Sequence, residues 1–210
     1  NTLPDILDGL KPNMFWAAGK LFALRQCAAP CVMLDTDFIV WETLNLPDDG
    51  ILCAHREDIS DDVYPDPRNY NMRGGYAFPF NTPENLAVLP CNTAFALFTD
   101  NQFKEYYLDI SFDFMRNAIV CDDGLTRMVT AEQRLLAMCA EAKGVPIRTL
   151  LDKNRLFLPQ DGFTHLWGAK GALRANPVER KKFYARCKKR ISTDFPNQYF
   201  AVKFIQSFEH

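Results

Sequence analysis

Two aspartates interrupt an apolar segment between Val32 and Val40, which reads Val-Met-Leu-Asp-Thr-Asp-Phe-Ile-Val. Carboxylates among apolar residues are costly to bury unless they are paired or bound to a cation. Residues i and i+2 of a strand point to the same side, so Asp35 and Asp37 could reach one ion at the end of a strand. Such hard oxygen ligands suit Mg²⁺ or Mn²⁺, ions that commonly bind substrate phosphates as well. The alternative is that one aspartate caps a loop and the other pairs with a basic residue.

A second candidate group lies late in the chain, where residues 163–170 read Phe-Thr-His-Leu-Trp-Gly-Ala-Lys. The neutral imidazole of His165 could complete a Mn²⁺ shell, and Lys170 could neutralise a leaving diphosphate. A histidine beside a tryptophan is also commonly a packed structural residue. The other histidines, His55 and His210, have no comparable neighbours.

The elements that must position these groups alternate between helical and extended patterns, which predicts an α/β fold. Helices are expected over residues 14–28, 101–119, 130–143, 177–191 and 197–208. Strands are expected over residues 31–40, 51–54, 86–89, 92–98, 145–151, 155–158 and ending at His165. The helix at 130–143 is expected to open with a capping box at Thr130-Ala-Glu-Gln133. The irregular segment 58–85 is rich in Pro and Gly, which is typical of functional loops.

Length and composition favour one globular domain over residues 1–210, and the charge pattern marks a basic helical extension at 174–210. The 210 residues are 48% hydrophobic and 24% charged, which excludes a disordered or low-complexity chain. No apolar run approaches the roughly 18 residues of a membrane span, and no signal-peptide pattern opens the chain. The seven cysteines include no Cys-x-x-Cys pair and predict buried, reduced thiols in a cytoplasmic protein.

Charge is divided unevenly along the chain. The net charge is −2, but residues 166–210 carry +7 and the remainder carries −9. A basic run at 180–190 is ordinarily a solvated helix face, and it could also contact phosphates, nucleic acid or an anionic membrane. No aromatic residues are interleaved in the manner that stacks bases, so we expect no nucleic-acid partner. The run does predict peripheral contact with the inner face of a membrane.

Four sequence elements occur in a characteristic order. They are Asp35-x-Asp37 at the end of a strand, Asn92 in a turn of small residues, the acid–Gln pair Glu132-Gln133, and His165-x-x-Gly168-x-Lys170. This order resembles the nucleotide-sugar glycosyltransferases of the GT-A fold, and is similar to that of glycogenin-like and bacterial galactosyltransferase-like enzymes. The likeness covers about residues 14–173. It implies a mixed sheet flanked by helices.

The position of the first element adds an expectation about the N-terminal end. In the GT-A fold the Asp-x-Asp follows the strands that hold the nucleotide base, whereas here only 34 residues precede Asp35. The resemblance therefore predicts an N-terminally short domain, with part of the nucleotide-binding region outside this chain.

The resemblance also assigns roles to individual residues. Asp35 and Asp37 would bind the divalent cation, with His165 as the third protein ligand and Asp35 also near the ribose. Lys170 would contact the diphosphate, and Gly168, beside Trp167, would let the backbone approach it.

Further along the same comparison, Asn92 and Thr93 would contact the donor sugar. The catalytic pair Glu132 and Gln133 would line the cleft for donor sugar and acceptor. If the reaction inverts configuration, an acid such as Glu132 must act as base; if it retains configuration, the leaving phosphate can do much of that work.

The implied activity is metal-dependent hexosyl transfer in bacterial glycan biosynthesis. A nucleotide-diphosphate donor, a UDP-sugar by preference, would transfer its sugar to a saccharide, lipid-linked or protein acceptor with Mn²⁺ or Mg²⁺ as cofactor. The cation and Lys170 would stabilise the charge that develops on the leaving diphosphate.

Two other functions are compatible with the same residues. A haloacid-dehalogenase-like phosphatase would use Asp35 as nucleophile and Asp37 as acid/base, with Asp122-Asp123-Gly124 as a late metal-binding pair. A degenerate sugar-nucleotide fold would act as a non-catalytic binding module.

Overall fold

The computed structural model describes residues 10–121, 123–156, 158, 160 and 162–198. These residues form two compact units. The larger unit lies within Asn1–Thr36 and Leu44–Pro159, and the smaller unit lies within Asp37–Thr43 and Gln160–His210. Helices and a mixed sheet make up the larger unit, so the expected α/β class with a mixed, helix-flanked sheet is confirmed.

The sheet of the larger unit has four strands in the order β1-β4-β3-β5. They are β1 (Cys31–Leu34), β4 (Phe95–Phe98), β3 (Ile51–Cys53) and β5 (Ile147–Thr149). β4 pairs antiparallel with both β1 and β3, and β3 pairs parallel with β5. The last residue of β1, Leu34, lies opposite the first residue of β4, Phe95. The segments that follow β1 and precede β4 are therefore held together at one end of the sheet.

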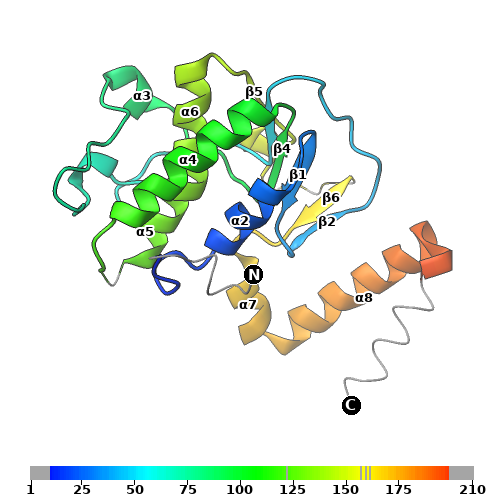
Figure 1. Cartoon of the computed structure of the whole chain (residues 1–210). Coiled ribbons are helices and arrows are strands. Elements are labelled where there is room, and N and C mark those ends of the chain that lie inside the picture. Colours follow the sequence, from blue (N-terminus) through cyan, green and yellow to red (C-terminus); the bar gives the residue numbers. More distant parts are fainter. Residues whose placement is uncertain (1–9, 122, 157, 159, 161, 199–210) are drawn as a thin grey trace. The chain divides into compact units, whose positions relative to one another are not determined.

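The middle strands form the core of the larger unit. Every residue of β3 and β4 is buried, whereas β1 lies at an edge and is half exposed. Because successive strand residues point to opposite faces, full burial of β4 means that both of its faces are covered. Helix α4 (Asn101–Asn117) lies between α2 (Ala18–Gln26) and α6 (Leu135–Lys143), as Figure 1 shows.

Side-chain caps set the helix boundaries and correct two of the expectations. Residues 86–89 are not a strand: the Thr82 side chain accepts a hydrogen bond from the Asn85 amide, and helix α3 (Pro83–Ala87) begins with proline at its first position. Thr130 does not begin a helix. The helical backbone already begins at α5 (Gly124–Val129), which Asp123 caps, more than one turn before Thr130. The helical backbone then continues through a π-helical segment, Thr130–Arg134, into α6.

Other boundaries also differ from the expected ones. The expected strand at 31–40 is two strands, β1 and β2 (Phe38–Val40), separated by the turn that carries the aspartates. Residues 155–158 are not a strand, because Asp152 caps a 3₁₀ turn at Lys153–Arg155. The expected helix at 197–208 lies almost wholly outside the described residues.

The smaller unit contains a two-stranded sheet and two helices. β2 pairs antiparallel with β6 (Phe163–His165), and α7 (Ala169–Ala175) is followed by α8 (Pro177–Asp194). The Asn176 side chain accepts hydrogen bonds from the amides of Val178 and Glu179, and Pro177 occupies the first helical position. The expected basic helix is thus confirmed, with its end three residues later.

A glycine allows the approach of β3 to β5. Gly50 has φ +74, and a Cβ placed on it would lie 2.4 Å from the carbonyl oxygen of Pro146. That carbonyl accepts a hydrogen bond from the Ile51 amide at the start of β3. We therefore expect Gly50→Ala to lower the free energy of unfolding by at least about 1 to 2 kcal/mol, through left-handed strain plus displacement of β5. Urea unfolding measures this, with Gly74→Ala as control because its added Cβ meets no atom within 4 Å.

All seven cysteines are free thiols. Cys53, Cys91 and Cys139 are buried as expected, but Cys27 is exposed, since it follows the end of α2. Among the described residues, no helix combines the length and apolar character that crossing a membrane requires.

Candidate active site

Four polar side chains from distant parts of the sequence meet in the larger unit. Lys20 Nζ lies 2.6 Å from the Asp35 carboxylate and also forms an ion pair with Glu132. The Thr93 hydroxyl donates a hydrogen bond to Glu132. Glu132 is buried, while Lys20 and Asp35 keep 22% and 32% of their side-chain surface exposed. This set, Lys20, Asp35, Thr93 and Glu132, is here named the carboxylate cluster; it is closed at Glu132 and open to solvent at Asp35.

The sheet places two members of the cluster. The Asp35 amide donates to the carbonyl of Ala94 at 2.8 Å, which extends the pairing of β1 and β4 by one step. Thr93 stands immediately before that carbonyl, in the turn that leads into β4. The strand pairing therefore brings Asp35 next to the turn of small residues that contains Thr93.

The π-helical segment places Glu132. π-helical turns are rare and frequently occur at functional sites. Here the carbonyl of Ala131 accepts from Ser111 Oγ and that of Glu132 accepts from the Tyr107 hydroxyl, both at 2.8 Å. Ser111 and Tyr107 are buried residues of α4. Helix α4 thus anchors the backbone from which the Glu132 side chain extends toward Lys20.

For both Glu132 and Lys20, burial and the ion pair shift the pKa in opposite directions. Burial raises the pKa of the Glu132 carboxyl above its ordinary value, and attraction to Lys20 and the hydrogen bonds from Lys20 and Thr93 offset this only in part. For Lys20, burial lowers the pKa, but attraction to Glu132 and hydrogen bonds to Asp35 and Glu132 outweigh it, so that the pKa is raised overall. Lys20 is therefore the cation that offsets part of the cost of ionising the buried Glu132 carboxyl.

Gln133 is oriented by a residue from the irregular segment. The Tyr64 hydroxyl donates to Gln133 Oε1 at 2.5 Å, so the amide group of Gln133 keeps its donors for another partner. Arg134 fixes the same segment, because its guanidinium donates to the carbonyls of Tyr64, Pro65 and Leu86.

Both polar atoms of the Asn92 side chain are hydrogen-bonded, one to Glu57 and one to the local backbone. Its Nδ2 donates to Glu57 Oε1 at 2.7 Å, and its Oδ1 accepts from the Ala94 amide at 3.2 Å. Only 5% of its surface is exposed. In this arrangement Asn92 shapes the turn that presents Thr93, and a contact of its own with a sugar stays a prediction.

The second aspartate and the late group belong to the smaller unit. Asp37 Oδ2 lies 2.8 Å from Lys170 Nζ, and the Asp37 carbonyl accepts from the Leu166 amide at 3.2 Å. His165 pairs with Phe38 across β2 and β6, and the two rings are 5.6 Å apart. The structure thus brings the sequence-predicted Asp37, His165 and Lys170 into one short stretch of the β2–β6 sheet and its exit.

Trp167 and Gly168 form the exit from β6. Gly168 has φ +67, the left-handed conformation that glycine adopts most readily, and it stands at the N-terminal cap of α7. Trp167 is 40% exposed beside it. Both residues are accessible for the donor contacts that the resemblance implies, and those contacts stay predictions.

The resemblance implies a bound divalent cation. The carboxylates present are of the chemical type that binds such an ion, but the described residues do not assemble them into a binding site. Carboxylates are suitable ligands, but Asp35 pairs with Lys20 in the larger unit while Asp37 pairs with Lys170 in the smaller unit. Among the residues that the structure describes, no group of three His, Cys, Asp or Glu side chains is arranged to hold a metal ion. We therefore derive no step through a metal, and the ligand set of Asp35, Asp37 and His165 stays a prediction.

The late acidic pair of the phosphatase alternative is partly described. Asp123 caps α5, since its Oδ1 accepts from the Thr126 amide at 3.2 Å and its Oδ2 accepts from the Thr126 hydroxyl. Asp122 lies outside the described residues.

Sequence reasoning missed Lys20 as a site residue. The signal was present, because Lys20 is the one charged residue in the apolar stretch from Met14 to Leu24. A single cation on a helix whose neighbours Ala18, Leu21 and Leu24 are buried has to find an anion or reach solvent. Tyr64 was missed as well, and the sequence carries no comparable sign of it.

The chain matches no protein-family model, no curated protein and no solved structure. The functional assignment therefore depends on the residues and on their geometry.

Proposed function

We propose that this chain is a glycosyltransferase that uses a nucleotide-diphosphate sugar as donor, with a domain of the GT-A type. The observation that supports the proposal most directly is the convergence of three separate sequence elements in the larger unit. Asp35 of the Asp-x-Asp, Thr93 of the small-residue turn and Glu132 of the acid–Gln pair meet around Lys20.

The chemistry of the cluster suits transfer of a sugar. Thr93 and Gln133 offer hydrogen-bonding groups next to a buried carboxylate, which is the combination that orients a hydroxyl-rich ligand. Glu132 is paired with Lys20 and, in its ionised form, can accept a proton from an acceptor hydroxyl or stabilise positive charge at the anomeric carbon. Asp35 is the most exposed member of the cluster, so a ligand could reach the cluster from solvent at this residue.

Lys20 has a second role in this proposal. A donor or acceptor hydroxyl that displaces the Lys20–Glu132 contact would leave Glu132 with a weaker counter-charge and a higher pKa, and would make it a stronger proton acceptor. The ion pair thus keeps the negative charge of Glu132 compensated by Lys20 until a substrate is bound.

Ligand-dependent thermal stability tests the proposal. UDP, GDP and UDP-sugars, each with and without Mn²⁺, should raise Tm if the cluster is part of a donor site. A ligand at about 100 times its Kd adds about 2.7 kcal/mol of stability. For a chain of this size that corresponds to a Tm rise of roughly 5 to 10 °C. We expect Asp35→Asn to remove most of this rise and the exposed Asp61→Asn to preserve it.

Three results would contradict the proposal. One is the absence of any Tm response to nucleotide diphosphates and their sugars. Another is hydrolysis of p-nitrophenyl phosphate with formation of a beryllium-fluoride adduct, which would favour the phosphatase. The third is nucleotide-sugar binding without release of nucleotide in the presence of acceptors, which would favour a binding module.

A further inference from the structure

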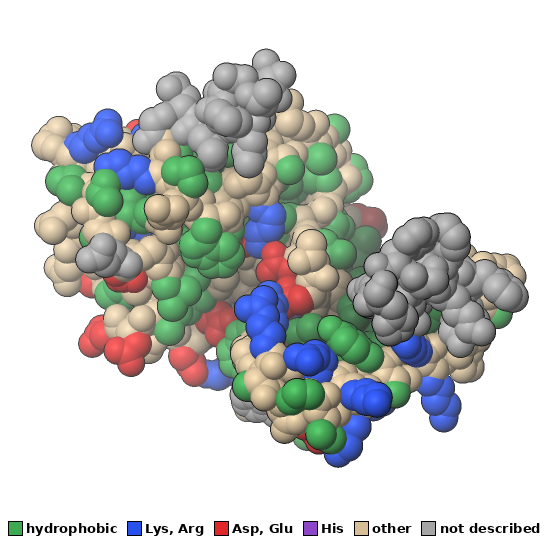
Figure 2. Space-filling view, turned by 90° about the horizontal axis from the view of Figure 1, so that it is seen from below, with side chains coloured by type: hydrophobic (Ala, Val, Ile, Leu, Met, Phe, Trp, Pro, Cys, Tyr) green, Lys and Arg blue, Asp and Glu red, His purple; other side chains and the backbone are tan. Residues whose placement is uncertain are grey.

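We propose that the outer face of helix α8 docks on an anionic lipid bilayer. Residues three and four apart lie on the same side of a helix. Five residues at this spacing in α8 are all exposed: Val178, Lys181, Lys182, Ala185 and Lys188. This set is named the outer stripe. Figure 2 shows Lys and Arg side chains gathered over α7 and α8, the part of the smaller unit to which the stripe belongs.

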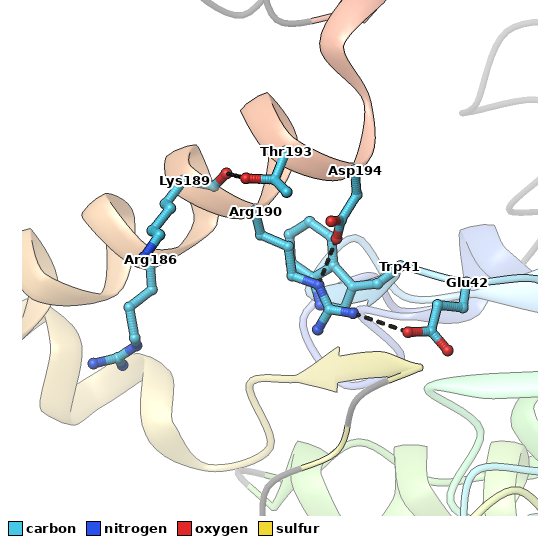
Figure 3. Close-up of a pocket in the computed structure, with 7 residues that line it drawn as sticks. All are labelled: Trp41, Glu42, Arg186, Lys189, Arg190, Thr193 and Asp194. Atoms are coloured by element: carbon cyan, nitrogen blue, oxygen red, sulfur yellow. Dashed lines mark hydrogen bonds and ion pairs between the residues drawn. The ribbon is translucent and has the colours of Figure 1, made fainter.

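The opposite side of α8 is fixed within the smaller unit. Arg190 stacks on the Trp41 ring at 4.9 Å and pairs with Asp194 at 2.9 Å and Glu42 at 3.4 Å (Figure 3). Together with Arg186, Lys189 and Thr193, these residues line an open pocket of about 540 Å³. Phe183, which is on the same side as Arg190, is half-buried. The contacts of Arg190 hold one side of α8 against Trp41 and Glu42. The outer stripe therefore faces away from these two residues.

The charge of the outer stripe is the first reason for choosing an anionic surface. Its three lysines lie on one side of a helix of 18 residues, which is about 27 Å long. Only Lys182 has a carboxylate partner, Glu179, at 2.8 Å, among the ion pairs of the described residues. Lysines near an anionic leaflet each favour adsorption by a factor of about five.

Apolar residues are the second reason, and they favour a bilayer over nucleic acid. Val178 is 62% exposed within the stripe, and Tyr184 is 56% exposed at its border. Valine gains nothing against a phosphate backbone, whereas it can enter the acyl boundary of a bilayer, and tyrosine is favoured at the headgroup level. A single exposed tyrosine does not provide the successive stacking surfaces of single-strand binders.

Vesicle binding tests this inference independently of the proposed enzymatic activity. The probes are vesicles of pure phosphatidylcholine and vesicles with about one part in three of phosphatidylglycerol. We expect the chain to co-sediment only with the anionic vesicles, and to be released when salt rises from about 50 to about 500 mM.

Substitutions locate the contact on α8. Lys181→Gln with Lys188→Gln should lower the partition coefficient about thirtyfold, since two cations are lost. The matched control removes two exposed cations of the larger unit, Arg116→Gln with Lys143→Gln, and should change the partition coefficient less than threefold. Tyr184→Ser should weaken binding at high salt more than at low salt, because its contribution is apolar.

Several outcomes would overturn the inference. Equal binding to neutral and anionic vesicles would do so, as would equal losses for the α8 and control variants. Salt-sensitive binding of RNA or DNA duplexes without any vesicle binding would assign the stripe to nucleic acid instead.

Discussion

Replacing Lys20 by methionine is expected to destabilise the chain by about 3 kcal/mol at pH 8 and by much less at pH 4. Lys20 is the shared counter-ion of Asp35 and of the buried Glu132. Removing one partner of a buried ion pair leaves an uncompensated charge, which typically costs about 3 to 5 kcal/mol. The partial exposure of Lys20 and Asp35 places the expected value at the lower end of that range.

The pH dependence follows from the raised pKa of both groups. Lys20 has a raised pKa in the folded state, so its contribution to stability is present below its ordinary value of 10.5 and is lost only at higher pH. Without Lys20, the pKa of Glu132 rises further above its ordinary value of 4.5. At pH 4 the Glu132 carboxyl is then mostly protonated in both the folded and the unfolded state, and most of the penalty disappears.

Urea unfolding at pH 4, 6 and 8 measures this effect. Lys143→Met is the matched control, because Lys143 is exposed and contacts the Tyr106 ring, so its loss should change stability by no more than about 0.5 kcal/mol at each pH. Equal destabilisation by Lys20→Met at pH 4 and pH 8 would show that the aliphatic part of Lys20, and not its charge, is what matters.

The second large effect concerns catalysis. Glu132→Gln is expected to lower the rate of nucleotide release from a sugar donor by about 10² to 10⁴-fold, since a positioned proton acceptor contributes about that much. Glutamine preserves the shape of the side chain and can still accept the hydrogen bond from Thr93. Donor affinity should therefore change only a few-fold, and the loss should appear in kcat.

Steady-state nucleotide release, with Glu141→Gln as an exposed control on α6, tests this expectation. A Glu132→Gln variant with kcat and KM both unchanged would make the Lys20–Glu132 pair purely structural. A variant with unchanged kcat but a much larger KM would place Glu132 in ground-state binding of the donor.

Much of the fold could be predicted because the signals are local. The amphipathic pattern of residues 101–119 predicted α4 to within two residues at its end, and the structure adds Asp100 as its cap. The Asn176-Pro177 pair predicted the first residue of α8. The expectations that were wrong were also local: residues 86–89 read as a strand because a short apolar run has no periodicity of its own, and the Thr82-Pro83 cap was overlooked.

The candidate site was also predictable only in part. Asp35, Thr93 and Glu132 were expected to act together, and the structure brings them together. Lys20 was not expected there, since its pairing with Glu132 depends on how α2 packs beside α4 and β1. The joint binding of a cation by Asp35 and Asp37 stays a prediction, because each aspartate has its own lysine and the two belong to different units.

The sequence alone determined the α/β class, the extent of α4 to within two residues and the start of α8, because caps, proline positions and apolar spacing act within a few residues along the backbone. Only the tertiary structure decided which candidate residues share a site. Strand order β1-β4-β3-β5 and the packing of α2 and α4 join Lys20 to Glu132. Those contacts depend on the burial of whole elements against each other, and the energy of a buried charge depends on the partner that this burial provides.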